Sequence, residues 1–364
     1  MRRGWCPTVF APMPSGDGLL VRVKPPLGRL LAVQARALAA AAARDGNGVL
    51  ELTGRANLQI RGLTAASAER FARAMVGAGL ASPDPAAERR RTVAVAPLAD
   101  AASLDVAASL EDALTQDDAL AALPAKFGFA VALSGIAADV RLYPSGEFWA
   151  VWPDGAGIAA ATRAPVRAAL GLAHAFLAVA PGAARMHDAD ADALFAAAGL
   201  RPALPAPLPL RPRIIGQLPG GFGVGLPFGA VDAATLDRLA ACGTLHVTPW
   251  RAFLVAAATA VPPDPALILD PADPRRALTA CPGRPACAAA AADVRADALA
   301  LARRFPGRAL HLSGCAKGCA DPRPAPLTLV AGADGYALVR NGTAADPPVA
   351  RGLSLGQIAA MIAA

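Results

Sequence analysis

Polar and apolar residues alternate along the segment that follows Thr53. The polar members are Arg55, Asn57, Gln59 and Arg61, and the apolar residues between them are Ala56, Leu58 and Ile60. Because successive side chains of a strand point to opposite faces, this period of two predicts a strand with all four polar groups on one face. Such a face is either an ordinary solvated surface or a cationic floor for the carboxylates of a flat ligand, which arginine binds through two parallel hydrogen bonds.

A second strand is predicted over residues 123–133. Its alternation turns one set of side chains to one face: Phe127, Phe129, Val131 and Leu133. Lys126 and Gly128 then point to the other face. A lone lysine at the start of a strand is most often a solvated charge.

Further patterns indicate an α+β chain. Residues 138–143 and 148–152 flank the turn Pro-Ser-Gly-Glu and predict a hairpin, with an alanine-rich helix at 163–180 behind it. Near the end of the chain we expect a helix at 294–304 and strands at 309–312 and 327–330.

One order of turn, strand, helix and strand occurs twice. The first copy begins at 15–18 and its last strand is 48–53, and the second begins at 220–223 and ends at 243–248. Each copy follows its final threonine with an arginine, Arg55 or Arg251, and the second has Phe253 and Val255 where the first has Asn57 and Gln59. This pattern predicts a duplication in which only the first copy is fitted for a polar ligand. The glycines near 221–225 do not have dinucleotide-binding spacing.

A proline-rich segment separates the two copies. Residues 201–213 predict an extended connector, because proline disfavours both helix and ladder pairing. The expected organisation is a first repeated unit at 1–75, an α+β unit at 76–200, the linker at 201–213, a second repeated unit at 214–270 and a second α+β unit at 271–364.

Composition and charge limit the classes of molecule that the protein is expected to bind. Hydrophobic residues make up 55% of the 364 residues, but many are alanine, and the greasiest stretch, 166–180, is too short and interrupted to span a bilayer. No secretory signal is visible at the start, so we expect a cytoplasmic protein without membrane association. The net charge of +7 comes from scattered arginines without interleaved aromatics, which fits an acidic small molecule or a plain basic surface rather than nucleic acid.

Four cysteines carry the most specific chemistry. Cys281 and Cys287 are separated by five residues, and Cys315 and Cys319 by three. Two loops that each donate a pair of thiolates can hold one iron–sulfur cluster. A structural zinc site is the alternative, although such sites usually have closer pairs, and a disulfide-bonded secreted module is disfavoured by the absence of an export signal.

Together these features resemble the sulfite and nitrite reductase haemoprotein superfamily along nearly the whole chain. The resemblance rests on the cysteine pairs, the Thr-x-Arg-x-Asn-x-Gln strand, the Leu-Pro-x-Lys-Phe strand and the duplication. It implies an α+β fold in which duplicated ferredoxin-like half-domains pair around a pseudo-twofold axis, with two flanking reductase-type α+β domains. It also implies a [4Fe-4S] cluster bound by the four cysteines. The residues that would line the tetrapyrrole are Arg55, Asn57, Gln59, Arg61 and Arg251. Arg91 and Lys126 would face the reactive side of the tetrapyrrole.

Departures from the reductase pattern point to one branch of the superfamily. The reductases carry a second lysine at the place of Gly128, and their last cysteine pair commonly encloses Pro-Asn-Gly, where this chain has Ala-Lys-Gly. In these differences, in Cys6-Pro7 and in the sequence of residues 12–22, the chain resembles the precorrin-3B synthases. In the reductases sirohaem is a cofactor, whereas in this branch the tetrapyrrole is the substrate.

That resemblance implies an oxidoreductase of the monooxygenase type in aerobic cobalamin biosynthesis. It would hydroxylate precorrin-3A at C20 with O2 and close a γ-lactone with the ring A acetate. NADH would be the reductant, with a possible separate electron-donor reductase, and a mononuclear non-haem iron is implied beside the cluster. A sirohaem-dependent sulfite or nitrite reductase is the alternative.

The remaining candidates are weaker. No iron-binding motif includes any of the four histidines, which are His174, His187, His246 and His311. The segment that contains His187, Asp188 and Asp190 is better explained as a solvated loop. Cys242 is expected in the core, whereas Cys6 could approach the active site. Lys317 either favours the reduced cluster by its charge or is solvated.

Overall fold

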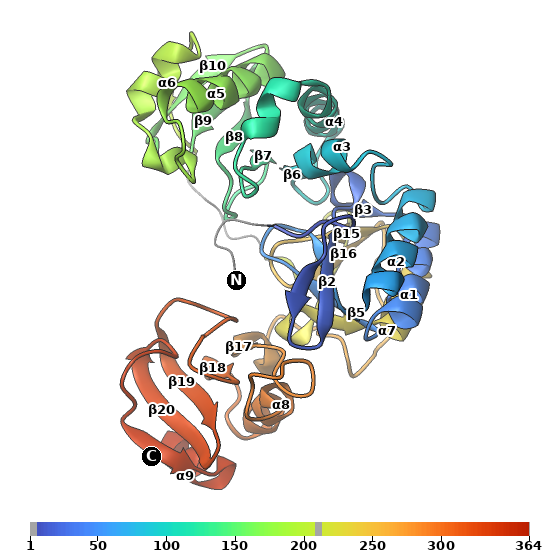
Figure 1. Cartoon of the computed structure of the whole chain (residues 1–364), viewed down its shortest axis with the longest axis vertical. Coiled ribbons are helices and arrows are strands. Elements are labelled where there is room, and N and C mark those ends of the chain that lie inside the picture. The colour runs from blue at the N-terminus through green and yellow to red at the C-terminus, as the bar shows by residue number, and fades with distance from the viewer. Residues whose placement is uncertain (1–5, 208–212, 364) are drawn as a thin grey trace.

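Four β-sheets organise residues 6–207 and 213–363, the parts of the chain that the computed structural model describes (Figure 1). Two five-stranded sheets form the centre. A six-stranded sheet lies at one end of the molecule, and the C-terminal five-stranded sheet lies at the other.

The two central sheets are built from the predicted repeats, and each repeat lends one strand to the other. The first sheet has the order β1 (Met13–Ser15), β2 (Gly18–Val23), β5 (Leu58–Leu63), β4 (Val49–Leu52) and β14 (Ala230–Asp232). The second has the order β12 (Gly216–Leu218), β13 (Gly221–Gly225), β16 (Ala252–Ala256), β15 (Leu245–Val247) and β3 (Arg29–Leu30). Strand β14 of the second repeat thus pairs with β4 of the first, and β3 of the first pairs with β15 of the second. The reciprocal exchange confirms the duplication.

The same tight turn directs both exchanged strands. Pro26–Gly28 precedes β3 and Pro227–Gly229 precedes β14, and the middle residue of each turn, Leu27 or Phe228, has a left-handed backbone. A positive φ is costly outside glycine, so its recurrence at equivalent non-glycine positions marks a shared constraint on the path into the partner sheet.

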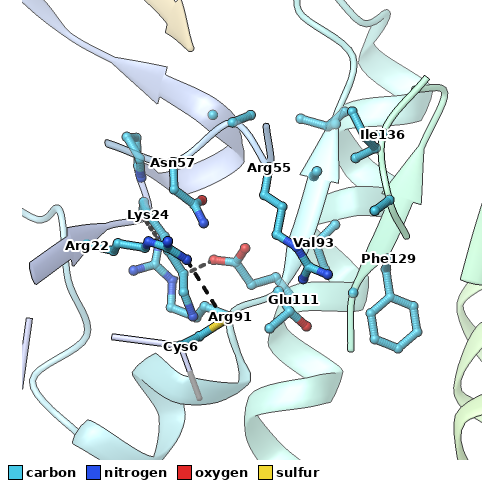
Figure 2. A pocket seen from close by; sticks show the side chains of 18 of the residues that line it. Cys6, Arg22, Lys24, Arg55, Asn57, Arg91, Val93, Glu111, Phe129 and Ile136 are labelled. Carbon is cyan, nitrogen blue, oxygen red and sulfur yellow. Dashed lines mark hydrogen bonds and ion pairs between the residues drawn. The ribbon is translucent and has the colours of Figure 1, made fainter. Parts of the chain in front are cut away.

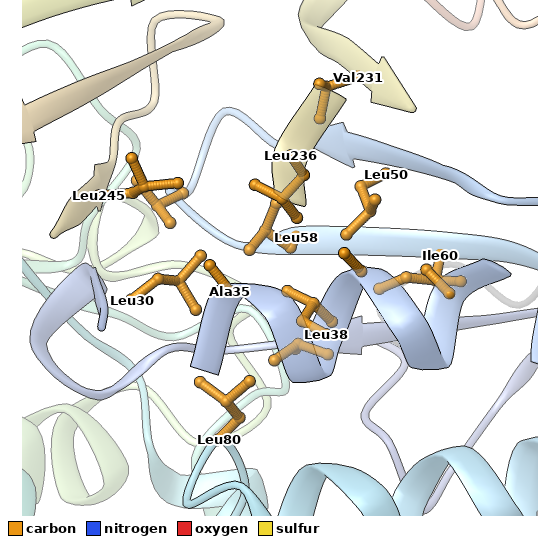
Figure 3. Packing of buried hydrophobic residues seen from close by; sticks show 14 of the residues in the cluster. Leu30, Ala35, Leu38, Leu50, Leu58, Ile60, Leu80, Val231, Leu236 and Leu245 are labelled. Atoms are coloured by element: carbon orange, nitrogen blue, oxygen red, sulfur yellow. The ribbon is translucent and has the colours of Figure 1, made fainter. Parts of the chain in front are cut away.

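Helices cover one side of the paired sheets. They are α1 (Ala32–Asp45), α2 (Ala65–Gly77) and α7 (Ala233–Ala240). Thr64 caps α2 and Asp232 caps α7, each accepting a hydrogen bond from a backbone N–H of the first turn. Leu38 of α1, Leu58 of β5 and Leu245 of β15 belong to one continuous core (Figure 3), so the two half-domains share their apolar interior.

The middle domain contains the six-stranded sheet. Its order is β11 (Pro202–Pro205), β10 (Ile158–Thr162), β9 (Phe148–Pro153), β8 (Val140–Ser145), β7 (Phe129–Val131) and β6 (Val93–Val95). The helices are α3 (Pro85–Arg90), α4 (Ala101–Gln116), α5 (Pro165–Val179) and α6 (Ala191–Ala197). The predicted hairpin is β8–β9, and the predicted helix at 163–180 is α5.

The linker prediction was wrong for its first part. Residues 202–205 form β11, which pairs with β10 at Pro202 and Pro205 as well as at Leu204. Proline is tolerated there because β11 is an edge strand, whose other side needs no ladder bonds. Residues 208–212 of the predicted linker lie outside the described residues.

The strand predicted at 123–133 is also shorter than expected. Strand β7 covers only Phe129–Val131, and Lys126 lies in an exposed turn before it. Ala132 has a φ of 51°, which breaks the alternation. Leu133 therefore packs with Ala130, on the opposite face from Phe127, Phe129 and Val131.

The C-terminal domain carries the cysteines. Its sheet has the order β17 (Leu278–Ala280), β18 (Leu310–Ser313), β19 (Ala325–Gly332), β20 (Gly335–Gly342) and β21 (Ala350–Leu353), with helices α8 (Val294–Arg304) and α9 (Leu355–Ala363). Strands β17, β18 and β19 are parallel neighbours. Strand β18 overlaps the strand predicted at 309–312, shifted by one residue, and β19 contains the one predicted at 327–330. No helix in the described ranges is long and apolar enough to cross a membrane.

Candidate functional site

The four cysteines gather at one edge of the C-terminal sheet. Cys281 directly follows β17, and Cys315 follows β18 by one residue, so the carboxyl ends of two parallel neighbours bring them together. The backbone N–H of Gly314 donates to Sγ of Cys281 at 3.2 Å. Burial raises the pKa of the Cys319 thiol, and three further thiols add to the rise: Cys315, Cys281 and Cys287. None of the four forms a disulfide.

Four thiolates are the donor set of a [4Fe-4S] cluster, and they also occur at structural zinc sites. Within residues 6–207 and 213–363, no three His, Cys, Asp or Glu side chains approach closely enough to hold a single metal ion. A structural zinc site needs four ligands around one atom, whereas each thiolate of a cubane cluster binds a different iron. The same finding provides no ligand set for the mononuclear iron.

The first half-domain holds the cysteine loop in place. Arg61 of β5 forms an ion pair with Asp17 at 3.1 Å and donates to the carbonyl oxygen of Ala286, next to Cys287. A Cβ on Gly16 would lie 2.8 Å from the backbone nitrogen of Ala288 and 3.2 Å from Cα of Cys287. The turn between β1 and β2 therefore packs directly on the backbone of this loop.

The polar strand face serves this interface more than a ligand. Gln59 accepts from Arg22 at 3.3 Å and donates to Glu51 at 3.1 Å, and Glu51 forms an ion pair with Arg295 of α8. Because Arg61 also has internal partners, neither Gln59 nor Arg61 is free.

Arg55 does not belong to the strand face that the sequence predicts. Strand β5 begins at Leu58, and Ala56 has a φ of 54°, so Arg55 lies in the turn before the strand. The prediction of four polar groups on one face was therefore wrong for this residue, because a left-handed residue interrupts the period of two.

The prediction that Arg251 of the second repeat is equivalent to Arg55 of the first was wrong by one position. The N–H of Thr53 bonds to the carbonyl of Asn57, and the N–H of Thr248 bonds to that of Ala252. Counting from these threonines, Arg251 is equivalent to Ala56, and both have a left-handed backbone. Trp250 therefore stands where the first repeat has Arg55.

A small chamber lies between the first half-domain and the middle domain (Figure 2). Cationic side chains from several segments face it: Arg22, Lys24, Arg55 and Arg91. Cys6, Asn57, Gly128 and Ile136 also line this first chamber, whose volume is about 60 Å³. Sequence reasoning missed Arg22 and Lys24, which alternate with buried valines on β2 and its continuation.

Two of these cations are held by protein groups: Arg91 by two carboxylates, and Lys24 by a backbone carbonyl. Arg91 donates to Glu111 and Glu88 at 2.8 Å each and to the carbonyl of Lys24 at 2.9 Å. The ammonium of Lys24 donates to the carbonyl of Glu88 at 3.0 Å, and burial lowers the pKa of Lys24. All three nitrogen atoms of the Arg91 guanidinium are thus engaged by protein.

The other two cations have no carboxylate partner in the described chain. Arg22 contacts Gln59 and the thiol of Cys6, and the guanidinium of Arg55 makes no hydrogen bond or ion pair there. Burial lowers the pKa of Arg55, and Arg185 lowers it further, yet a guanidinium stays protonated at neutral pH. Asp139 lies near enough to raise the pKa of Arg55, but its ion pair is with Arg185. A partly buried guanidinium without an ion pair of its own is a candidate site for an anionic ligand.

Gly128 leaves room for Arg55. A Cβ built on Gly128 would lie 3.6 Å from Nη1 of Arg55, so the guanidinium passes over the place where a side chain would begin. The buried carboxylate of Asp139 accepts from the N–H of Gly128 at 3.0 Å and fixes this backbone. The guanidinium of Arg55 therefore lies beside the backbone of Gly128, at the position where the sequence lacks a lysine.

The other predicted candidates lie elsewhere. Lys126 is exposed and does not line the first chamber. His187 contacts Asp154 at 3.1 Å on the surface, while Asp190 caps α6. His311 is buried, and both its ring nitrogens lack a partner within the described residues.

Comparisons with known proteins agree with this architecture. Residues 11–77 match the nitrite/sulfite reductase ferredoxin-like half domain. The solved structure of the NirA protein of Mycobacterium tuberculosis superposes with a TM-score of 0.63 and 18% identity, covering 86% of this chain and 71% of that one. This likeness supports the predicted fold class.

A curated sequence gives the closer relationship. The precorrin-3B synthase of Sinorhizobium sp. is 34% identical to this chain, over an alignment that spans 96% of this chain and 85% of the relative. Because the alignment spans 96% of this chain, it includes both half-domains and both flanking domains. The chain belongs to the precorrin-3B synthase family.

Proposed function

We propose that this protein is a precorrin-3B synthase, an oxidoreductase of aerobic cobalamin biosynthesis that hydroxylates precorrin-3A at C20 and closes the ring A acetate into a γ-lactone. The observation that carries the proposal is the 34% identity to a curated precorrin-3B synthase along 96% of the chain. The unpaired arginines of the first chamber support it, because the substrate is a flat polycarboxylate.

Substrate binding is the role of arginines that have no ion-pair partner in the described chain. Arg55 and Arg22 bind carboxylates at the first chamber, and Asn57 adds an amide beside them. Arg251 binds from the second half-domain, where its Nη1 is held by the carbonyl of Leu278 and the hydroxyl of Thr279 at 3.0 and 3.3 Å. Arg91 positions Lys24 and the chamber wall, Arg61 positions the cysteine loop, and Gln59 acts through Glu51 on helix α8.

Electron supply is the role of the C-terminal domain. The ligands of a [4Fe-4S] cluster would be Cys281, Cys287, Cys315 and Cys319, and the bound cluster would supply electrons one at a time. NADH, through a separate reductase, is the proposed source. The ligands of a mononuclear iron are not part of the proposal. The proposed location is the cytoplasm.

One experiment tests the activity directly. The protein is purified without oxygen, its iron and sulfide are counted, and it is incubated with precorrin-3A, O2 and a reductant. We expect about four iron and four sulfide per chain and a hydroxylated lactone detected by mass spectrometry. Sirohaem in an acid extract, or a cluster-loaded protein that leaves precorrin-3A unchanged, would contradict the proposal and favour a sulfite or nitrite reductase.

A further inference from the structure

Three polar side chains form one row across neighbouring strands of the first central sheet. Arg22 of β2 lies directly opposite Gln59 of β5, and Gln59 lies directly opposite Glu51 of β4. Side chains that are opposite each other in paired strands project from the same face and interact. The row therefore leads from Arg22, which faces the first chamber (Figure 2), to Glu51, which contacts helix α8.

Hydrogen bonds give this row a direction. Nε and Nη2 of Arg22 each donate to Oε1 of Gln59 at 3.3 Å, and Nε2 of Gln59 donates to Oε2 of Glu51 at 3.1 Å. The other oxygen of Glu51 accepts from Arg295, whose guanidinium lies 5.8 Å from the ring centre of Phe228. An ionised carboxylate only accepts hydrogen bonds, so Glu51 turns the NH2 group of the Gln59 amide towards itself and the amide oxygen towards Arg22.

Charge is distributed unevenly along the row. The buried carboxylate of Glu51 has its ion pair with Arg295, whereas Arg22 has no ion-pair partner in the described chain. The amide of Gln59 is neutral, and it keeps the backbones of Arg22 and Glu51 two strand spacings apart, about 10 Å. Two hydrogen bonds thus hold Arg22 in place without giving it a counter-charge.

We propose that Gln59 is a positioning residue, which directs Arg22 into the first chamber without an ion pair, and that Glu51 fixes the orientation of the Gln59 amide. This inference rests on the proposed function, in which Arg22 binds a substrate carboxylate. A carboxylate at position 59 would hold Arg22 equally well, but it would compete with the anionic ligand for the same guanidinium. The neutral side chain at this position therefore sets how strongly the chamber attracts an anion.

An exchange of two side chains separates this role from a structural one. The double variant Glu51→Gln, Gln59→Glu leaves the composition and the net charge of the protein unchanged. Every hydrogen bond of the row can still form, because the carboxylate at position 59 accepts from Arg22 and from the amide at position 51, whose oxygen accepts from Arg295. Arg22, however, gains an ion pair. A purely structural row predicts wild-type binding, whereas a positioning role predicts weaker binding in a folded protein.

The probe is uroporphyrin, whose flat ring carries carboxylate arms, titrated into the full-length protein and followed by fluorescence. We expect the double variant and Arg22→Gln each to bind about tenfold more weakly than wild type, because each loses one charged hydrogen bond to the ligand. The affinity should also depend less on salt concentration in both variants, since one ionic contact fewer is screened. The midpoint of urea unfolding should be the same for the double variant as for wild type.

The outcomes distinguish this inference from the proposed function. Wild-type affinity and salt dependence in the double variant, with weakened binding by Arg22→Gln, would overturn the positioning role and leave the proposed function standing. Unchanged binding by Arg22→Gln, or no binding by the wild-type protein, would count against the proposed function as well. Should the double variant unfold, Gln59→Glu alone gives Arg22 the same carboxylate, and wild-type affinity of that variant would equally overturn the positioning role.

Discussion

Gly128 is the residue at which this chain departs most informatively from the reductase pattern. The absent side chain does not leave empty space, because the guanidinium of Arg55 passes over the site. Gly128 thus leaves room on the middle domain for a guanidinium that comes from the first half-domain.

Substitution of Gly128 should reveal this dependence. In Gly128→Ala the added Cβ would lie 3.5 Å from the carbonyl of Thr92 and 3.6 Å from Arg55, which are ordinary contacts. The affinity of the protein for uroporphyrin, a flat tetrapyrrole polycarboxylate that serves as a probe, should therefore stay within about threefold of wild type. Gly128→Leu should push Arg55 aside without adding charge and weaken binding about tenfold, because one charged hydrogen bond is lost. Fluorescence titration measures both, and equal affinity of the two variants would show that Arg55 does not need this space.

His246 should make stability depend on pH. It is 8% exposed on β15, and burial, with a contribution from Arg29, lowers its pKa to about 4. The unfolded chain takes up a proton near pH 6.5 and the folded chain does not, so stability is complete above pH 6.5 and falls towards pH 4, by about 3 kcal/mol in all.

Urea unfolding followed by circular dichroism at pH 7.5, 6, 5 and 4.5 can measure this loss. His246→Gln has no titrating ring and should show a flatter pH profile between pH 6.5 and 4.5 than the wild type. Parallel profiles for the two proteins would mean that another group causes the acid sensitivity.

At the level of elements, local alternation predicted strands and helices well and their ends poorly. The hairpin β8–β9 and the helix α8 are where the pattern places them, since regular periods reflect a buried and an exposed face. The errors arise where one residue leaves the regular backbone: Ala56 and Ala132 have positive φ, and Pro202–Pro205 pair at an edge. Only tertiary structure reveals such positions, as it reveals which arginines lack a counter-charge.

The turn between β1 and β2 is an element whose fit can be tested through the cysteines. Gly16→Ala should force the backbone around Cys287 and Ala288 to move, because its Cβ would approach within 2.8 Å; overpacking of this kind costs about 1–3 kcal/mol. We expect a lower iron and sulfide content after anaerobic purification. Gly157→Ala, with nothing within 4 Å of the added Cβ, is the matched control and should load normally. Normal loading of both variants would show that the turn does not hold the cysteine loop.

At the scale of the whole molecule, the exchanged strands make the halves interdependent. Strands β3 and β14 each complete the sheet of the other repeat, and one core runs through both. Either half alone would expose the edge of β4 or β15 together with core leucines such as Leu50 or Leu245, which favours aggregation. No local sequence pattern predicts this, because the pairing joins segments about 180 to 215 residues apart.

Expression of residues 1–207 and 213–364 as two polypeptides tests that interdependence. Produced together, they should purify as a one-to-one complex, because both central sheets and the shared core can form across the break. Produced separately, each should be insoluble or should lack protection from amide hydrogen exchange in its half-domain, namely in β4 and β5 of residues 1–207 and in β15 and β16 of residues 213–364. The middle and C-terminal domains have cores of their own, so their protection is not the criterion. If residues 1–207 alone gave a monomer in which β4 and β5 were as well protected as in the complex, the exchanged strands would be dispensable, and the two repeats would be independent domains that happen to lie together.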